Sequence, residues 1–141
     1  WRSWLEAHSI PRSVRLAISA GAPLPVTLEQ AVFETHGLKI HNFYGATECG
    51  GIAYDATDVP RKDPTVVGTA IHRVRLALSP SGCLRVSGPN VGSGYWPDPD
   101  VSLGKRVYQT SDLAEFDGPE LRLLGRAGDL INVAGRKVAP D

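Results

Sequence analysis

Apolar residues in the first part of the chain follow a strand spacing and then a helix spacing. Residues 14–18 alternate enough between apolar and polar positions to predict a strand. From Leu28 to Thr35, a stripe at i, i+3, i+4 and i+7 predicts a helix, and Gly37 is a natural stop after it. Residues 38–43 are expected to form a second strand. The order strand, helix, strand indicates a parallel α/β unit.

Two helix starts have the spacing of a capping box, in which two side chains satisfy free backbone N–H groups. Ser3 precedes Glu6 by three residues, and Thr27 precedes Gln30 by the same interval. We therefore expect a short first helix that is capped near Ser3 and ends at Pro11, and a second helix that is capped at Thr27.

Short strands dominate the chain after Pro60. Residues 73–78 and 84–86 alternate on either side of a Pro-Ser-Gly turn, which predicts a β-hairpin with one buried face. A second hairpin is expected over residues 112–123, with its turn at an Asp-Gly pair.

The predicted fold class is therefore α/β, with a parallel strand-helix-strand segment followed by a mostly antiparallel β module. The expected parts are residues 1–60 and residues 66–125, with residues 60–64 as the plausible linker. In parallel units, ligands collect at the carboxyl ends of the strands. The loop at residues 19–23 and the segment at residues 42–48 are expected at that edge.

Composition narrows the class of protein. Lys plus Arg equals Asp plus Glu at 15 each, so no basic surface predicts nucleic acid as a partner, and no apolar run approaches the about 20 residues that span a membrane. Cys49 and Cys83 lack CxxC spacing, which predicts free thiols in a reducing compartment, the cytoplasm. Because the chain has no initiator methionine and no signal-peptide pattern, we expect it to be part of a longer protein, whose remainder is a partner.

Residues 42–48, Asn-Phe-Tyr-Gly-Ala-Thr-Glu, form the segment with the most informative chemistry. The ring of Tyr44 can stack on a purine, and Gly45 lets backbone approach a ligand. Thr47 can donate to a phosphate oxygen, and Glu48 can bind a hard divalent cation. The alternative is a tyrosine packed in the core, with a capped turn after it.

Two later residues fit a nucleotide site as well. Asp112 lies at an expected strand start, where a carboxylate can accept hydrogen bonds from both ribose hydroxyls; the alternative is a turn aspartate. Arg126 lies between glycine-containing segments and suits phosphate or sugar oxygens; the alternative is a surface salt bridge.

Other candidate sites are weaker. Cys49 has no histidine within local reach to activate it as a nucleophile, and the four histidines lack metal-ligand spacing. Gly50 and Gly51 suit either room for an acyl group or a tight turn. The glycine-rich stretch at residues 88–94 lacks a Lys-Ser/Thr ending and is expected to be a turn loop.

The segment at residues 42–48 resembles the Tyr-Gly-x-Thr-Glu motif of the adenylate-forming superfamily, which includes acyl-CoA synthetases, peptide-synthetase adenylation domains and luciferases. Four more segments resemble motifs of that superfamily in the same order and extend the resemblance over nearly the whole chain. They are residues 19–24, 84–96, 108–113 and 125–138. The resemblance implies that the chain is the later part of an N-terminal lobe, with residues 126–141 as the hinge and the start of a C-terminal lobe.

On the adenine side of the site, the resemblance implies that Gly21, Ala22 and Pro23 flank one face of the base, and that Tyr44 lies against the other. Asn42 and Gly45, in the same motif as Tyr44, are implied as nucleotide-binding residues.

On the phosphate side, the resemblance makes Thr47 and Glu48 the catalytic residues. Thr47 would contact the α-phosphate, and Glu48 would bind Mg²⁺. Asp112 would bind the ribose hydroxyls, and Arg126 would assist there.

The implied reaction uses ATP to convert a carboxylic acid into an acyl-adenylate, with release of pyrophosphate. A thiol then takes the acyl group; CoA is the expected acceptor, and a carrier-protein thiol is the other possibility. The alternative function is a nucleotide-binding or scaffolding module without turnover.

Three departures from the superfamily pattern affect this interpretation. Ser111 replaces a glycine before Asp112, and Gly128 stands where a hinge Asp or Lys is usual, with Asp129 one place later. The phosphate loop and the C-terminal lobe, each with its lysine, are not in the chain. The 141 residues alone are therefore expected to be inactive.

Overall fold

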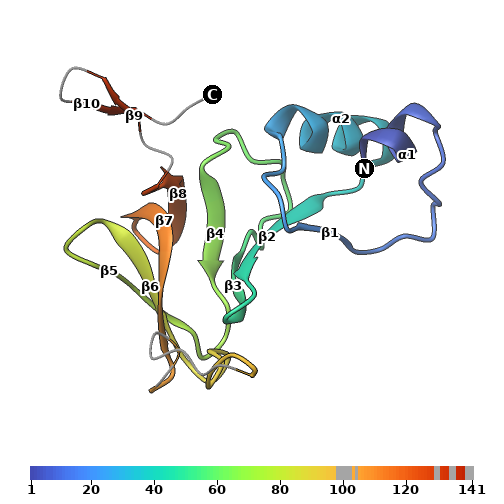
Figure 1. Cartoon of the computed structure of the whole chain (residues 1–141). Coiled ribbons are helices and arrows are strands. Elements are labelled where there is room, and N and C mark those ends of the chain that lie inside the picture. The colour runs from blue at the N-terminus through green and yellow to red at the C-terminus, as the bar shows by residue number, and fades with distance from the viewer. Residues whose placement is uncertain (98–102, 104, 129–130, 134–135, 139–141) are drawn as a thin grey trace.

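The computed structural model describes residues 1–97, 103, 105–128, 131–133 and 136–138. Eight strands form one mixed sheet in the order β1-β2-β3-β4-β8-β7-β6-β5, and β9 pairs with β10 separately (Figure 1). The helices are α1 (Arg2–Glu6) and α2 (Val26–His36). The strands are β1 (Ala17–Ala20), β2 (Ile40–Ala46), β3 (Gly50–Tyr54), β4 (Val66–Ala70), β5 (Arg75–Leu78), β6 (Cys83–Ser87), β7 (Val107–Asp117), β8 (Glu120–Arg126), β9 (Ile131–Val133) and β10 (Arg136–Val138).

The first part of the chain contains the predicted parallel unit. β1 and β2 pair in parallel, with α2 between them in sequence, and every other pair in the large sheet is antiparallel. Both helices lie at the β1–β2 end of the sheet, and β5 and β6 lie at the other end (Figure 1). This mixed architecture confirms the predicted fold class.

The expected end of the second strand was wrong. β2 runs on to Ala46, and β3 returns beside it as an antiparallel partner that was not predicted. A Cβ on Gly45 would lie 2.4 Å from the carbonyl oxygen of Gly50. The absence of a side chain at Gly45 therefore allows the two strands to approach this closely.

Both predicted capping boxes were wrong. The N-cap residues are Trp1 and Pro25, neither makes a side-chain cap, and Ser3 and Thr27 lie inside the helices. At the second helix, the carbonyl of Pro25 already accepts hydrogen bonds from two backbone N–H groups of the first turn, each at 3.1 Å. The end of α2 is as predicted, because the helix stops at His36 and Gly37 after it adopts a left-handed conformation with φ of 62°.

A buried ion network joins α2 to the segment that was expected to be a linker. Glu29 is fully buried and pairs with Lys39 and with Arg61, whose Nε lies 2.9 Å from the carboxylate. Lys39 also binds Asp55 at 2.6 Å. Residues 60–64 therefore hold a buried cation, and the sheet continues across this boundary from β3 to β4. The division at this segment stays a prediction.

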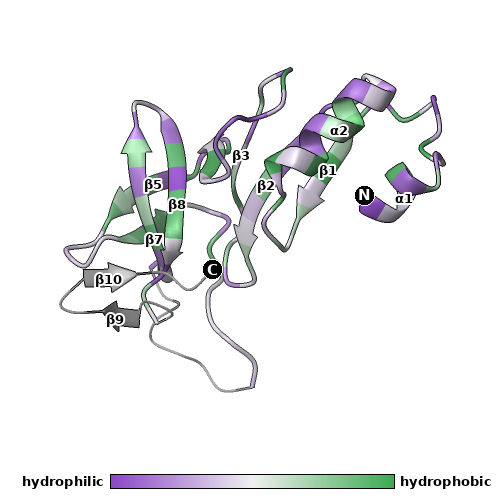
Figure 2. Cartoon of the chain, turned by 90° about the horizontal axis from the view of Figure 1, so that it is seen from above, coloured by the Kyte–Doolittle hydropathy of each residue, from purple (hydrophilic) through white to green (hydrophobic). Residues whose placement is uncertain are grey.

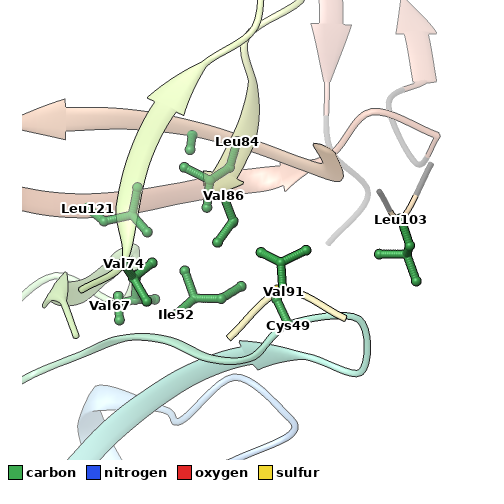
Figure 3. Close-up of a cluster of buried hydrophobic side chains, with 11 residues drawn as sticks. Cys49, Ile52, Val67, Val74, Leu84, Val86, Val91, Leu103 and Leu121 are labelled. Carbon is green, nitrogen blue, oxygen red and sulfur yellow. The ribbon is translucent and has the colours of Figure 1, made fainter. Parts of the chain in front are cut away.

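Both predicted hairpins are present, as β5–β6 and β7–β8. Apolar and polar residues alternate along much of β8 (Figure 2). Their inward side chains pack with β3 and β4 in the larger core, where Ile52, Leu84, Val86 and Leu121 are directed toward one another (Figure 3). A smaller core lies between α2 and the β1–β2 pair. Among the candidate site residues, Tyr44 packs against the larger core.

Candidate functional site

Asp112 on β7 is held between two predicted site residues. The Tyr44 hydroxyl on β2 donates a hydrogen bond to Oδ2 at 2.5 Å, and Arg126 Nε donates to Oδ1 at 3.0 Å. Arg126 lies directly opposite Asp112 in the β7–β8 register. Three residues from separate motifs therefore meet at one carboxylate, whose side chain is 14% exposed.

The backbone at Asp112 is fixed by Thr110. The Asp112 N–H donates to Thr110 Oγ1 at 3.0 Å, and this hydroxyl donates to the carbonyl of Leu84 on β6 at 3.1 Å. Burial and the neighbouring Asp112 carboxylate raise the pKa of Tyr44 well above its usual value, so Tyr44 stays neutral and donates. Each carboxylate oxygen of Asp112 can accept one more hydrogen bond from a ligand hydroxyl.

Glu48 forms a second anionic centre after β2. The Tyr95 hydroxyl donates to Oε1 at 2.8 Å, and this bond is the main reason that the pKa of Glu48 is lowered. Burial, together with the charge of Glu48, raises the pKa of Tyr108 to about 12. Glu48 is therefore ionised at neutral pH, and the Tyr108 phenol beside it stays protonated.

An ionised Glu48 fits the expected role of a Mg²⁺ ligand. In nucleotide sites, this ion commonly uses one or two carboxylates together with substrate phosphates and water. In the part of the chain that the structure describes, no group of three or more His, Cys, Asp or Glu side chains could hold a metal alone. A cation at Glu48 would need ligands from a bound nucleotide, from water or from other segments.

The glycine-rich loop at residues 88–94 fixes the backbone around Glu48. Asn90 Nδ2 donates to the carbonyls of Cys49 and Gly51 at 2.7 and 2.8 Å, and the N–H of Gly92 donates to the carbonyl of Glu48 at 2.8 Å. Sequence reasoning missed this positioning role. It also missed Tyr95 and Tyr108 as site residues, although both lie inside segments that carry the superfamily resemblance.

The loop that follows β1 lies at the expected edge of the sheet. Gly21 has a φ of 86°, and Ala22 and Pro23 after it are exposed. Ala20 pairs with Phe43 in the parallel register, which brings this loop next to Tyr44. The predicted adenine-side residues thus come from neighbouring strands, although Tyr44 lies within its strand and not after it.

Three other predicted residues differ in their surroundings. Asn42 is buried, and its Nδ2 donates to the carbonyl of Val66 at 3.4 Å, which links β2 to β4. At Gly45, the backbone that comes close is that of Gly50 in the same β2–β3 hairpin. Thr47 is exposed in the turn before Glu48. Direct ligand contacts by these residues stay predictions.

The cysteines and the glycines after Glu48 have structural explanations. Cys49 and Cys83 are both free and buried, and burial together with the charge of Glu48 raises the pKa of Cys49 to about 11. A thiol with this pKa is a poor nucleophile at neutral pH. Gly50 has a φ of 58°, and a Cβ on Gly51 would lie 2.6 Å from the Phe43 ring. The tight turn is the alternative that the structure supports.

The hinge segment is described only in part. Gly128 is exposed, and Asp129 lies outside the described residues.

No helix among the described residues is long and apolar enough to cross a membrane.

Comparison with known proteins decides the family. The family described as AMP-binding enzyme matches residues 2–96. The chain belongs to this family. An anthranilate–CoA ligase from Pseudomonas aeruginosa is 35% identical and covers 96% of the chain, which spans 29% of that ligase. Tyrocidine synthase 2 from Brevibacillus parabrevis, which is 32% identical, covers 94% of the chain, and the chain spans 4% of that synthase.

A solved structure agrees with the fold. The O-succinylbenzoate coenzyme A synthetase from Bacillus subtilis, in complex with ATP and magnesium ion, matches with a TM-score of 0.84 and 25% identity. The match covers 99% of this chain and 32% of that structure. The chain thus spans about a third or less of these relatives, and the family resemblance of the sequence is confirmed.

Proposed function

We propose that the protein that carries this chain activates a carboxylic acid with ATP as an acyl-adenylate and transfers the acyl group to a thiol, with CoA as the acceptor. The observation that carries this proposal is Asp112, which Tyr44 and Arg126 hold in place while it keeps free acceptor capacity. Family membership and the names of the relatives support it.

In this proposal the chain forms one wall of the nucleotide site. Asp112 accepts hydrogen bonds from the two ribose hydroxyls, with Arg126 beside them. Adenine lies between Tyr44 and the loop that begins at Gly21. Asn42 and Gly45, on β2 with Tyr44, are the other nucleotide-binding residues of this proposal.

The phosphate groups lie toward the turn between β2 and β3. Thr47 donates to an α-phosphate oxygen from its exposed position, and ionised Glu48 offers a carboxylate oxygen to Mg²⁺. Mg²⁺, when bound, offsets the negative charge that develops as pyrophosphate leaves. The other charged groups needed for the chemistry would come from outside these residues.

The acceptor is the finer part of the proposal. The anthranilate–CoA ligase supports CoA, whereas tyrocidine synthase 2 keeps a carrier-protein thiol as the second candidate. Incubating the full-length protein with ATP, an acid and either CoA or a phosphopantetheinylated carrier protein distinguishes these acceptors, because only the correct thiol forms a thioester.

Exchange of labelled pyrophosphate into ATP tests the first half-reaction. The full-length protein should support exchange only when its carboxylic acid is present. Asp112→Asn should raise the KM for ATP about tenfold, because a charge-assisted hydrogen bond to ribose is lost. Ser111→Gly, at the neighbouring exposed position, is the matched control and should leave exchange unchanged.

Two results would count against the proposal. No exchange over a broad panel of aryl and fatty acids, together with measurable AMP binding, would support a nucleotide-binding module without turnover. Equal effects of Asp112→Asn and Ser111→Gly would remove Asp112 from the ribose site.

A further inference from the structure

A strongly basic pocket, apart from the candidate nucleotide site, lies at the β5–β6 end of the molecule. It has a volume of about 440 Å³, and four exposed cations line it: Arg73, Arg75, Lys105 and Arg106. No carboxylate is among the described residues that line it. None of the ion pairs among the described residues uses these four side chains.

The pocket and the candidate nucleotide site lie on opposite faces of the sheet. Ser87 pairs with Arg75 on one side and with Val107 on the other, and all three line the pocket. The next row contains Val86 and Tyr108, which face the core and the side of Glu48. Because successive residues of a strand point to opposite faces, the basic pocket is separate from the site at Glu48.

The backbone at this pocket is unusual. Arg73, Lys105 and Arg106 have φ values of 67°, 56° and 58°, which are left-handed conformations that non-glycine residues rarely adopt. They are three of the four such residues in the described part of the chain. A basic side chain stands at each of these positions, although a glycine would fit the backbone at lower energy.

Gly88 brings the two basic segments together. Its N–H donates to the carbonyl of Arg106 at 3.1 Å, and a Cβ at this position would lie 2.8 Å from the carbonyl oxygen of Arg73. A side chain at Gly88 would therefore push the Arg73 turn away from the start of β7. The two segments therefore stay together, and their basic side chains line one pocket.

We infer that this pocket binds a small polyanion that carries at least two phosphate groups. Four cations that line one pocket without a described counter-charge favour a bound multivalent anion, and guanidinium groups pair well with phosphate oxygens. The volume lies within the range of about 300–1,000 Å³ that is usual for small-ligand sites. The four cations line a single pocket, and the chain as a whole has equal numbers of acidic and basic residues. A basic charge confined to one pocket favours a compact ligand over a nucleic acid, which would need an extended basic surface.

Calorimetric titration of the full-length protein with inorganic tripolyphosphate tests the inference. The measurement is made at about 0.15 M ionic strength, where weak surface attraction is screened. The variant Arg73→Gly/Lys105→Gly removes two charges and supplies the residue that the left-handed backbone prefers. Its affinity for tripolyphosphate should fall at least about tenfold, while its unfolding temperature should not fall.

The control is Arg15→Gly, which removes an exposed cation just before β1, at the opposite end of the sheet from β5, and should leave the affinity unchanged. Pyrophosphate and orthophosphate are titrated in parallel, and affinity should decrease in the order tripolyphosphate, pyrophosphate, orthophosphate. A titration with ATP distinguishes the source of the phosphates, because the glycine double variant should weaken ATP only if this pocket takes nucleotide phosphates. Equal loss in the control, or no loss in the double variant, would overturn the inference, whatever the outcome of pyrophosphate exchange.

Discussion

Tyr44 and Asp112 are 68 residues apart in sequence, and a hydrogen bond of 2.5 Å joins them across the sheet. Tyr44 lies on β2 and Asp112 on β7, so this bond links two non-adjacent strands of the large sheet at the candidate nucleotide site. Arg126 completes the arrangement from the opposing strand. The geometry of the site therefore depends on how distant strands of this sheet pack.

Tyr44→Phe tests this link. The change keeps the ring and removes the hydroxyl donor. Of the two side-chain hydrogen bonds described for the Asp112 carboxylate, only the one from Arg126 then remains. We expect a loss of about 1–3 kcal/mol in the free energy of unfolding, measured by urea denaturation, and weaker AMP binding. Tyr54→Phe, at an exposed position on β3, is the control and should change neither quantity. An unaltered free energy of unfolding in Tyr44→Phe would mean that the hydrogen bond between Tyr44 and Asp112 does not stabilise the packing of β2 with β7.

Glu29→Gln tests the buried ion network. The neutral side chain leaves Lys39 and Arg61 without their shared carboxylate in a site where Glu29 is 0% exposed. Removing one member of a buried charge network costs about 3–5 kcal/mol, which urea denaturation should reveal. Glu34→Gln, on an exposed position of the same helix, should cost less than about 0.5 kcal/mol. Similar losses in both variants would contradict a special role for the network.

Tyr95→Phe tests the cause of the low pKa of Glu48. The Tyr95 hydroxyl stabilises the charged carboxylate, so its removal should move the pKa of Glu48 upward toward the ordinary value. A lowered pKa means that the charged form persists to more acidic pH, and the variant should lose that form at a higher pH. The change is measured by an NMR titration of the Glu48 side chain. A pKa that stays in place would assign the shift to the backbone hydrogen bond instead.

Gly45→Ala tests the close approach of β2 and β3. The added methyl would lie 2.4 Å from the Gly50 carbonyl oxygen, so the hairpin must open. We expect a loss of about 1–3 kcal/mol in thermal or urea unfolding, which is typical of overpacking. At Gly128, a Cβ would meet nothing within 4 Å, and Gly128→Ala serves as the control. If both variants unfold alike, steric conflict at Gly45 is not the reason for the glycine.

Several features of the fold follow from neighbouring residues alone. The helix ends at Gly37, and the β7–β8 turn contains Gly118 in a left-handed conformation, because glycine adopts positive φ without steric cost. The alternation at residues 84–86 predicts the buried face that Leu84 and Val86 form. These interactions extend over a few residues, and a local pattern is sufficient to predict them.

Other features depend on residues that are distant in sequence. The buried position of Glu29 follows from Arg61 and Lys39, and no helical spacing indicates it. The β2–β3 pairing follows from two glycines that face each other across the hairpin. The basic pocket exists because Gly88 lets the Arg73 and Arg106 segments converge.

The chemistry of Tyr44, Glu48 and Asp112, and their order along the chain, can be read from the sequence by itself, since residue type and motif spacing are local properties. Only the tertiary structure decided that Tyr44 and Arg126 share the carboxylate of Asp112, and that Tyr95 reaches Glu48. The reason is physical: these contacts form when two parts of one sheet pack together, and the position of each side chain is set by strand pairing far from its own motif.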